Sequence, residues 1–260
     1  DREKGSFVVS NIEEKERLRK PAAPYTTSSL QQDAANKINF TSKKTMMVAQ
    51  QLYEGVNIKG QGTIGLVSYI RTDSVRISEE ARAAAKDYII ANLGPDYYAI
   101  NYYTSKKKDV QDAHEAIRPS NIALTPESVK NSLTKDQFKL YNLIWTRFVA
   151  SQMAPAKFMA VNARIANGPY GFKATGSKLL FKGFLEVYEL KDKDLNKLLP
   201  HLDVGEELEP TSVDAEQNFT QPPARFTEAS LVKELEEKGI GRPSTYAPIV
   251  ATLTERKYVK

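Results

Sequence analysis

Cysteine is absent from the 260 residues of this chain, so neither a disulfide nor a thiolate zinc site can form within it. Histidine is also scarce, with two copies, and tryptophan occurs once. No window approaches the ~18–20 uninterrupted apolar residues of a membrane span. The charged start Asp1–Lys4 lacks the apolar region of a signal peptide. These absences predict a soluble protein of a reducing cytoplasm, with no membrane partner.

Charge of neither sign dominates the chain. Lysine and arginine number 37 against 32 acidic residues, which gives a net charge of +5. This balance favours a polyanionic partner but predicts a mixed surface and no basic tail. The length exceeds one typical domain of roughly 100–200 residues, so two units are the default expectation.

Helical patterns dominate residues 28–154. Ser42 and Ser78 are candidate helix caps, and Gly94-Pro95 is a stop signal. The clearest helix opens at a capping box formed by Thr134 and Gln137. Its apolar stripe has helical spacing and is predicted to be core and not a surface for stacking bases: Phe138, Tyr141, Ile144, Trp145, Phe148 and Val149.

The flanking regions have a different texture. Ser6–Ser10 is typical of a strand end, and beyond Pro155 the pattern predicts short strands at Phe158–Ile165, Tyr170–Ala174 and Phe184–Leu190. From Thr227 onward the sequence predicts two helices joined by a turn through Gly241–Ser244.

The most informative stretch is Gly65–Ser74, which reads GLVSYIRTDS. We predict a strand across residues 68–71, so that the side chains of Tyr69 and Arg71 emerge on the same face. A phenol titrates near pH ~10, so Tyr69 would act as a nucleophile only where developing charge is stabilised. Arg71 is placed to hold a phosphate. Asp73 and Ser74 more simply end the strand and turn the backbone.

Four further blocks accompany this stretch in a fixed order: Pro24–Gln32, Lys43–Met47, Asp112–Ser120, and Pro222–Phe226 continuing through Gly239–Tyr246. Together with Tyr-x-Arg-Thr-Asp-Ser, this order resembles the type IA DNA topoisomerases, the bacterial topoisomerase I group in particular. The matches span most of the chain, which makes the resemblance far more specific than one short motif.

The resemblance implies roles for three catalytic residues. Tyr69 would attack a DNA phosphodiester and become joined to the 5′ phosphate, releasing a 3′ hydroxyl. Arg71 would contact the scissile phosphate, for which the planar guanidinium suits better than lysine. His114 would assist near the same phosphate, whereas His201 lacks such a context and is predicted to be structural.

DNA-binding roles are implied for three more residues. Arg242 would meet a backbone phosphate and Thr245 a base of single-stranded DNA, assisted by amides at a helix terminus. Arg118 is a candidate DNA contact too, although it could equally pair with Glu115 inside the protein. The sequence leaves that choice open.

The implied fold class is α+β and multidomain. Residues 28–154 resemble the helical domain that carries the nucleophile, inserted between β-rich arms formed by 1–27 and 155–181. Residues 182–260 resemble part of a helical domain that forms a single-strand DNA groove. The complete enzyme would be a monomeric bacterial protein in the cytoplasm, at the nucleoid, that relaxes negative supercoils without ATP.

The resemblance also implies Mg²⁺, held by an acidic cluster on a domain outside this chain. The pair Asp192 and Asp194 lies in a lysine-flanked loop and is predicted to be a solvated turn, so no metal ligand is assigned here. We therefore expect a central fragment that is inactive alone.

Three other interpretations of the sequence compete with this one. Gly60-Gln-Gly62-Thr-Ile-Gly65 fits a dinucleotide-binding glycine pattern, but it precedes the predicted strand and opens no helix. The two terminal helices could be a helix-turn-helix module for duplex DNA, although Arg256 and Lys257 are few basic residues for one. A topoisomerase III-like decatenase is the nearest enzyme alternative.

Overall fold

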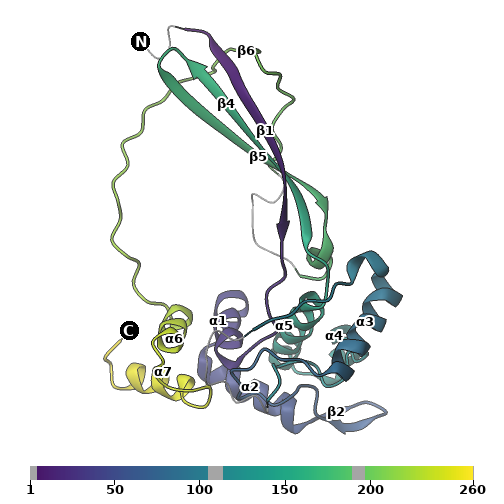
Figure 1. Ribbon diagram of the computed structural model, residues 1–260. Coiled ribbons are helices and arrows are strands. Elements are labelled where there is room, and N and C mark those ends of the chain that lie inside the picture. Colours follow the sequence, from purple (N-terminus) through teal and green to yellow (C-terminus); the bar gives the residue numbers. More distant parts are fainter. Residues whose placement is uncertain (1–4, 105–113, 189–196, 260) are drawn as a thin grey trace. The chain divides into compact units, whose positions relative to one another are not determined.

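The computed structural model describes residues 5–104, 114–188 and 197–259, and it mixes helices with strands (Figure 1). The chain divides into two compact units. Unit 1 is Asp1–Lys20 with Pro155–Pro223, and unit 2 is Pro21–Ala154 with Ala224–Lys260. Each unit is therefore built from two separate stretches of sequence. Residues 182–223 fall in unit 1, whereas the sequence assigned them to the same domain as 224–260; that domain assignment stays a prediction.

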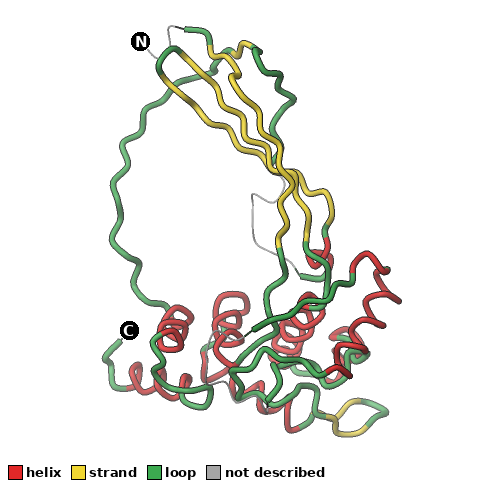
Figure 2. The backbone as a smooth tube through the Cα atoms, viewed as in Figure 1, coloured by secondary structure: helices red, strands yellow, loops and turns green. Residues whose placement is uncertain are grey.

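Unit 1 is an antiparallel sheet in the order β5-β4-β1-β6. Its strands are β1 (Phe7–Arg19), β4 (Ala156–Asn167), β5 (Tyr170–Phe181) and the short β6 (Glu207–Leu208). Figure 2 shows the long strands running side by side. β4 and β5 form a hairpin, and β1 pairs with β4 along almost its whole length. β1 thus continues well past the predicted strand end, through charged residues.

The third predicted strand of this region is wrong. Gly183–Glu186 forms a 3-10 turn, η3, with Phe184 buried in it; the end of the predicted strand, 189–190, lies outside the described residues. A glycine with positive φ (Gly183, 51°) begins this turn and takes the backbone out of the extended conformation.

One end of the sheet carries a small apolar core. Phe7 and Val9 of β1 are buried there, and the rings of Phe7 and Phe172 lie 5.3 Å apart. Further along, Gly176 of β5 lets a second segment approach, because a Cβ at this position would stand 2.8 Å from Leu199 Cγ. The segment around Leu199 therefore packs directly on one face of the sheet.

Unit 2 is mainly helical. Its helices are α1 (Thr27–Ile38), α2 (Ser42–Glu54), α3 (Glu79–Leu93), α4 (Pro126–Val129), α5 (Lys135–Ser151), α6 (Glu228–Glu237) and α7 (Tyr246–Glu255). Two 3-10 turns, η1 (Pro95–Tyr97) and η2 (Lys130–Ser132), and a hairpin of β2 (Val56–Ile58) and β3 (Gly62–Ile64) complete it. No helix among the described residues is long and apolar enough to cross a bilayer.

α5 forms the centre of unit 2. The predicted capping box of Thr134 and Gln137 is present at its start, and most of the predicted stripe is buried, with Ile144 and Val149 completely so. Two polar groups of the stripe reach main-chain acceptors: Tyr141 donates to Leu124 O at 2.6 Å and Trp145 to Ile122 O at 3.0 Å. The prediction that the stripe is core is therefore confirmed.

α6 and α7 complete unit 2 by packing against α1 and α2 respectively. Val232 and Leu235 of α6 and Tyr246 and Val250 of α7 make their own buried cluster. A hydrogen bond of 2.6 Å joins the two stretches of sequence, from Ser42 N at the start of α2 to Glu228 Oε1 at the start of α6.

Candidate active site

The segment that carries Tyr69 and Arg71 is extended but is not a strand. Val67 makes a single bridge to Pro119, and residues 68–78 pair with no neighbouring strand. The predicted strand over 68–71 is therefore wrong. The ladder stops because the facing N–H groups are used elsewhere: Arg118 N donates to the side chain of Ser68. Ala116 N donates to Arg76 O.

Side-chain hydroxyls replace the missing ladder. Buried Thr27, at the start of α1, donates from Oγ1 to Ile70 O at 2.7 Å and accepts from Thr72 N at 2.9 Å. Ser68 Oγ donates to Ala116 O at 2.9 Å and accepts from Arg118 N at 3.0 Å. These bonds fix the segment between α1 and residues 116–118.

The extended conformation still alternates its side chains. Ile70, Thr72 and Ser74 are buried, whereas Tyr69 and Arg71 point outward, with 38 % of Tyr69 exposed. The expectation that positions 69 and 71 share a face therefore agrees with the structure, although no strand produces it. Asp73 and Ser74 continue the same irregular segment.

Tyr69 lies between two other rings. Its ring centroid is 5.4 Å from that of His114, and 5.7 Å from that of Tyr53 in an edge-on arrangement at 71°. Such geometries are favourable for aromatic pairs. The structure thus brings two of the predicted catalytic residues, Tyr69 and His114, into direct contact, and adds Tyr53 from the last turn of α2.

The approach of Tyr53 to Tyr69 depends on Gly65. A Cβ at position 65 would stand 2.6 Å from Tyr53 O, which real structures do not allow. Leu66 N also donates to Leu52 O at 2.7 Å. The chain leaving the β2–β3 hairpin is therefore pressed against the end of α2 just before it reaches the tyrosine.

Arg118 pairs inside the protein. Its Nε and Nη2 donate to Glu115 Oε2 at 2.9 and 2.7 Å, and its Nη1 donates to Pro119 O at 3.0 Å. Burial raises the pKa of the Glu115 carboxyl, but hydrogen bonds from Ser78 and the charge of Arg118 outweigh it, so the pKa is lowered overall. The pair braces the segment on which His114 lies; of the sequence block 112–120, residues 112 and 113 lie outside the described part.

Arg71 faces a cavity of about 410 Å³ between α2, the turn before α7 and α7 itself. Lys43 and Met46 line it from α2, and Pro243 and Ser244 from the turn. Lys43 is well exposed, and its ion pair with Glu255 is long, at 3.7 Å. Two cations therefore border one solvent-accessible hollow beside the tyrosine segment.

Arg242 and Thr245 occupy the turn between α6 and α7. Arg242 is exposed, and its backbone N–H donates to Thr245 Oγ1 at 2.8 Å. Gly241, with φ of 77°, is needed here because a Cβ would meet Thr245 Oγ1 and Ile249 Cδ1 at 3.0 Å. The hydroxyl of Thr245 hydrogen-bonds with the backbone of Arg242 within the turn. It therefore does not cap the first turn of α7.

Electrostatics connects this turn with the tyrosine segment. Burial raises the pKa of Tyr246, and the charges of Glu236 and Asp73 raise it further, while Arg242 opposes them. Asp73 belongs to the extended segment and Arg242 to the turn. Asp73 and Arg242 therefore both lie close enough to Tyr246 to influence its pKa, in opposite directions.

Metal ligands are not grouped anywhere in the described ranges. No set of three or more histidine or acidic side chains that could hold a metal ion occurs among residues 5–104, 114–188 and 197–259. Asp192 and Asp194 lie outside those ranges. His201, predicted to be structural, is exposed and lies 3.5 Å from Asp203.

Tyr53, Gly65 and Thr27 were missed as parts of the site. Tyr53 lies near the end of α2, where 39 % of it is exposed. Thr27 and Gly65 lie in stretches that the sequence singled out, but their contacts have no local signal, because each is formed with a segment that is distant along the chain.

The chain is similar to known proteins in both sequence and structure. A family model described as DNA topoisomerase matches residues 1–260. The structure of full-length topoisomerase I from Thermotoga maritima superposes with a TM-score of 0.87 at 40 % sequence identity, over 98 % of this chain. The chain spans 42 % of that protein's length.

Proposed function

The chain belongs to the DNA topoisomerase family, within the bacterial type IA group, and we propose that it supplies the nucleophile with which the whole enzyme cuts and reseals one DNA strand. The observation that carries this proposal is the ring of Tyr69, half-exposed and in contact with His114, on the same outward side of the chain as Arg71.

The proposed step is a transesterification. The phenolic oxygen of Tyr69 bonds to phosphorus while the bond from phosphorus to the 3′ oxygen breaks, and the proton lost by the phenol is balanced by one gained at the 3′ oxygen. The product is a 5′-phosphotyrosine and a 3′ hydroxyl. Because one phosphoester replaces another, resealing is the same step reversed and needs no ATP.

Arg71 and His114 would assist at the phosphate. The guanidinium of Arg71 offers several donors in one plane to the charge that develops on the phosphoryl oxygens. His114 lies against the ring of Tyr69, where it would position the phenol or carry its proton. The Mg²⁺ expected in the complete enzyme has no ligand group within the described ranges, so only the roles of protein side chains are derived.

Arg242 and Thr245 would guide the single strand toward Tyr69. The turn that holds them borders the same cavity as Arg71, which supports one continuous path for a DNA strand. Arg118 stays a predicted DNA contact, but its three donor bonds within the protein favour a role in bracing His114.

The whole enzyme would pass the second strand through the break and relax negative supercoils, as a monomer at the DNA of a bacterial cytoplasm. The two alternatives are not favoured. α7, the would-be recognition helix of a duplex-binding module, packs Tyr246 and Ala247 into unit 2, and the structural likeness is to a topoisomerase I.

The test is to replace Tyr69 with Phe in the full-length protein that contains this chain. We expect the covalent adduct with a labelled oligonucleotide to disappear on a denaturing gel while noncovalent binding of single-stranded DNA is retained. An adduct that persists would remove Tyr69 from the mechanism.

A second measurement addresses the fragment. The 260-residue chain alone, given Mg²⁺ and negatively supercoiled plasmid, should leave the plasmid's linking number unchanged. Relaxation by this chain would show that the proposed need for further domains is mistaken.

A further inference from the structure

The sulfur atoms of this chain are unevenly distributed. The sequence has no cysteine and four methionines, so every sulfur atom that an oxidant could attack is a thioether. Met46 and Met47 are neighbours on α2, whereas Met153 and Met159 lie elsewhere in the chain. Half of the oxidisable sulfur is therefore on the helix that ends beside Tyr69.

Exposure separates these methionines further. Met47 is 56 % exposed and Met46 is partly exposed, whereas Met153 is completely buried. Met159 is partly exposed too, but it belongs to unit 1, and Tyr69 belongs to unit 2. Oxidation of a side chain depends on its exposure to the dissolved oxidant. Within unit 2, the two thioethers of α2 are thus the ones that a peroxide can reach.

Met46 differs from Met47 in what it faces. The lining of the cavity of about 410 Å³ that Arg71 faces includes Met46 and Lys43, but not Met47. Residues three apart on an α-helix lie on one side of it, whereas adjacent residues point in different directions. The thioether of Met46 therefore shares a solvent-accessible hollow with the guanidinium that is proposed to hold the phosphate.

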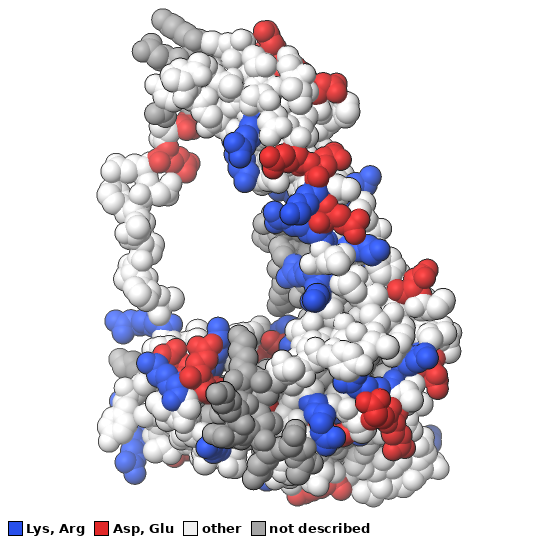
Figure 3. Space-filling model, in the orientation of Figure 1, with Lys and Arg blue, Asp and Glu red and all other residues white. Residues whose placement is uncertain are grey.

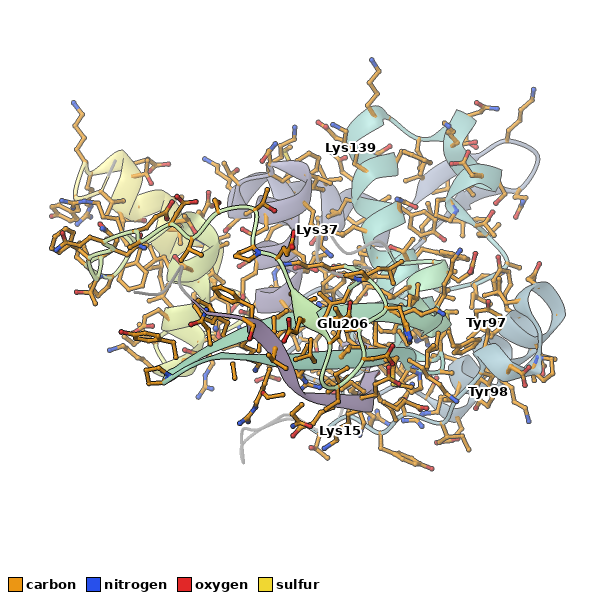
Figure 4. The ribbon with its side chains drawn as sticks, turned by 90° about the horizontal axis from the view of Figure 1, so that it is seen from above. Lys15, Lys37, Tyr97, Tyr98, Lys139 and Glu206 are labelled. Carbon is orange, nitrogen blue, oxygen red and sulfur yellow. The ribbon has the colours of Figure 1, made fainter. Side chains whose placement is uncertain are left out.

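The combination of a thioether with cations distinguishes this hollow. Lysine and arginine side chains occur over much of the visible surface (Figure 3), and exposed Lys139 can be followed on α5 in Figure 4, so exposed cations alone mark no site. The guanidinium of Arg71 offers several N–H donors, and a thioether accepts hydrogen bonds only weakly. Reduced Met46 therefore leaves these donors to a phosphate.

Oxidation would change the acceptor in the cavity. The sulfur lone pair bonds to one oxygen of hydrogen peroxide while the O–O bond breaks, and the proton of the transferred oxygen passes to the departing oxygen, which leaves as water. Sulfur is oxidised and peroxide is reduced, with no other reactant. The sulfoxide is a polar group in place of an apolar one, and its oxygen is a hydrogen-bond acceptor beside two cations.

We infer that Met46 is a site of reversible oxidation by peroxide that switches off DNA cleavage, because its sulfoxide oxygen accepts hydrogen bonds from Arg71 and takes the donors that would hold the scissile phosphate. The inference rests on the proposed function insofar as Arg71 is taken to contact that phosphate. Methionine sulfoxide reductases reverse the change: the oxygen leaves as water while two thiols become a disulfide.

The test follows cleavage by the full-length protein that contains this chain, with and without hydrogen peroxide. Every sample then receives dithiothreitol, which reduces oxidised thiols elsewhere in the protein but leaves sulfoxides. Met46→Leu and Met47→Leu are the matched variants, since leucine replaces methionine with little change of volume and has no sulfur. Single-turnover formation of the covalent adduct on a labelled oligonucleotide gives the rate, and peptide mapping by mass spectrometry locates the added oxygen.

Each rate is compared with that of the same variant without peroxide. The parent and Met47→Leu should lose roughly tenfold or more, which is the effect of one competing hydrogen bond to a charged group. Met46→Leu should keep its rate. Methionine sulfoxide reductases acting on both sulfoxide epimers should restore the parent, and the map should show oxygen at Met46 but not at Met153.

A second pair of variants tests the oxygen atom without peroxide. Met46→Gln places an amide oxygen in the cavity and should slow adduct formation, whereas Met47→Gln should not. In an Arg71→Lys background, which is already slow, Met46→Gln should have a smaller effect, because residues in contact are not additive. Thermal melting shows whether each variant keeps the fold.

Four outcomes would overturn the inference: an unmodified Met46 when Met47 is fully oxidised, equal losses in the parent and Met46→Leu, protection by Met47→Leu instead, or equal rates for the two glutamine variants. Failure of the proposed function gives a different signature. An adduct that survives Tyr69→Phe would remove the nucleophile, yet the peptide map would still report whether Met46 is oxidised.

Discussion

At the scale of single residues, the orientation of Tyr69 is set by rings and by a close backbone approach. His114 and Tyr53 contact its ring at 5.4 and 5.7 Å between centroids, while Thr27 fixes the backbone on its C-terminal side. The side chain of Tyr69, the proposed nucleophile, lies on an unpaired segment and would otherwise be free to turn. Side-chain contacts therefore fix the orientation of this segment, as backbone hydrogen bonds fix a strand within a sheet.

Gly65→Ala should disturb that arrangement. The added methyl would meet Tyr53 O at 2.6 Å, and because a main-chain atom cannot move aside alone, we expect a cost of about 1–3 kcal/mol in the free energy of unfolding. Urea unfolding measures it. Gly171→Ala is the control for added bulk, since nothing lies within 4 Å of a Cβ there and its φ, like that of Gly65, is not positive. Equal stability of Gly65→Ala and the parent would contradict the clash.

Tyr53 should act by positioning Tyr69. Tyr53→Phe keeps the edge-on ring and should form the adduct in the full-length protein at close to the parental rate, whereas Tyr53→Leu removes the ring and should slow it. An aromatic pair contributes about 0.5–1.5 kcal/mol, which corresponds to a rate decrease of roughly two- to tenfold if the whole contact is made in the reacting geometry. Single-turnover cleavage separates this rate from DNA affinity, which should not change; equal rates for Phe and Leu would refute the role.

Tyr103 provides a prediction about alkaline pH. Burial raises its pKa to about 12, with the charge of Arg147 opposing the shift, while an unfolded tyrosine titrates near pH ~10. Between about pH 10 and 12 the unfolded chain therefore binds fewer protons than the folded one, and stability falls as pH rises. Tyr103→Phe should make this decline shallower in urea titrations, though not abolish it, because burial also raises the pKa of Tyr141. An unchanged slope would contradict the shift.

At the scale of elements, the sequence predicted the helices better than it predicted the conformation of the segment 68–78, which carries Tyr69. Caps and apolar periodicity are local signals, so the capping box of Thr134 and Gln137 and the stop at Gly94 appear as expected. The predicted strand at 68–71 failed because a strand requires a paired neighbour, and the facing N–H groups of Ala116 and Arg118 donate to other acceptors. The extended backbone still alternates exposed and buried side chains, so Tyr69 and Arg71 lie on the same side, as the sequence predicted.

The contact between α1 and the tyrosine segment can be tested through Thr27. Thr27→Val removes the hydroxyl that binds Ile70 O and leaves Thr72 N without its acceptor. Burial of an unsatisfied polar group costs about 1–3 kcal/mol, so thermal unfolding should shift downward. Thr27→Ser restores the hydroxyl and should recover most of the loss; if Ser behaves like Val, the hydrogen bonds are not what matters.

At the scale of the whole molecule, two compact units predict two separable unfolding processes. Ile144→Ala in unit 2 and Val9→Ala in unit 1 each shorten a fully buried side chain. For the isoleucine, the free energy of unfolding should fall by about 2–5 kcal/mol. Hydrogen exchange followed by mass spectrometry should report faster exchange only in peptides of the unit that carries the change. Faster exchange throughout the chain in either variant would mean that the molecule unfolds as one.

The domain organisation is also where the sequence was least informative. The sequence predicted boundaries at 27/28 and 154/155, whereas the compact units divide after Lys20 and after Ala154; the domain assignment itself stays a prediction. The chain returns to unit 2 at Ala224, directly after Pro222 and Pro223. These prolines do not show which unit the following segment joins, because that depends on the packing of α6 and α7 against α1 and α2. Contacts between distant stretches are what composition cannot report.

The hydrogen bond between Ser42 N and Glu228 Oε1 has a consequence for protein synthesis. α1 and α2 emerge from the ribosome long before α6, and at about 5–20 residues per second the wait lasts roughly 10 to 40 s. During that time the side of α1 that will receive α6 stays open to water and the first amide of α2 lacks its carboxylate. A nascent chain arrested before residue 228 should therefore be a preferred client of chaperones.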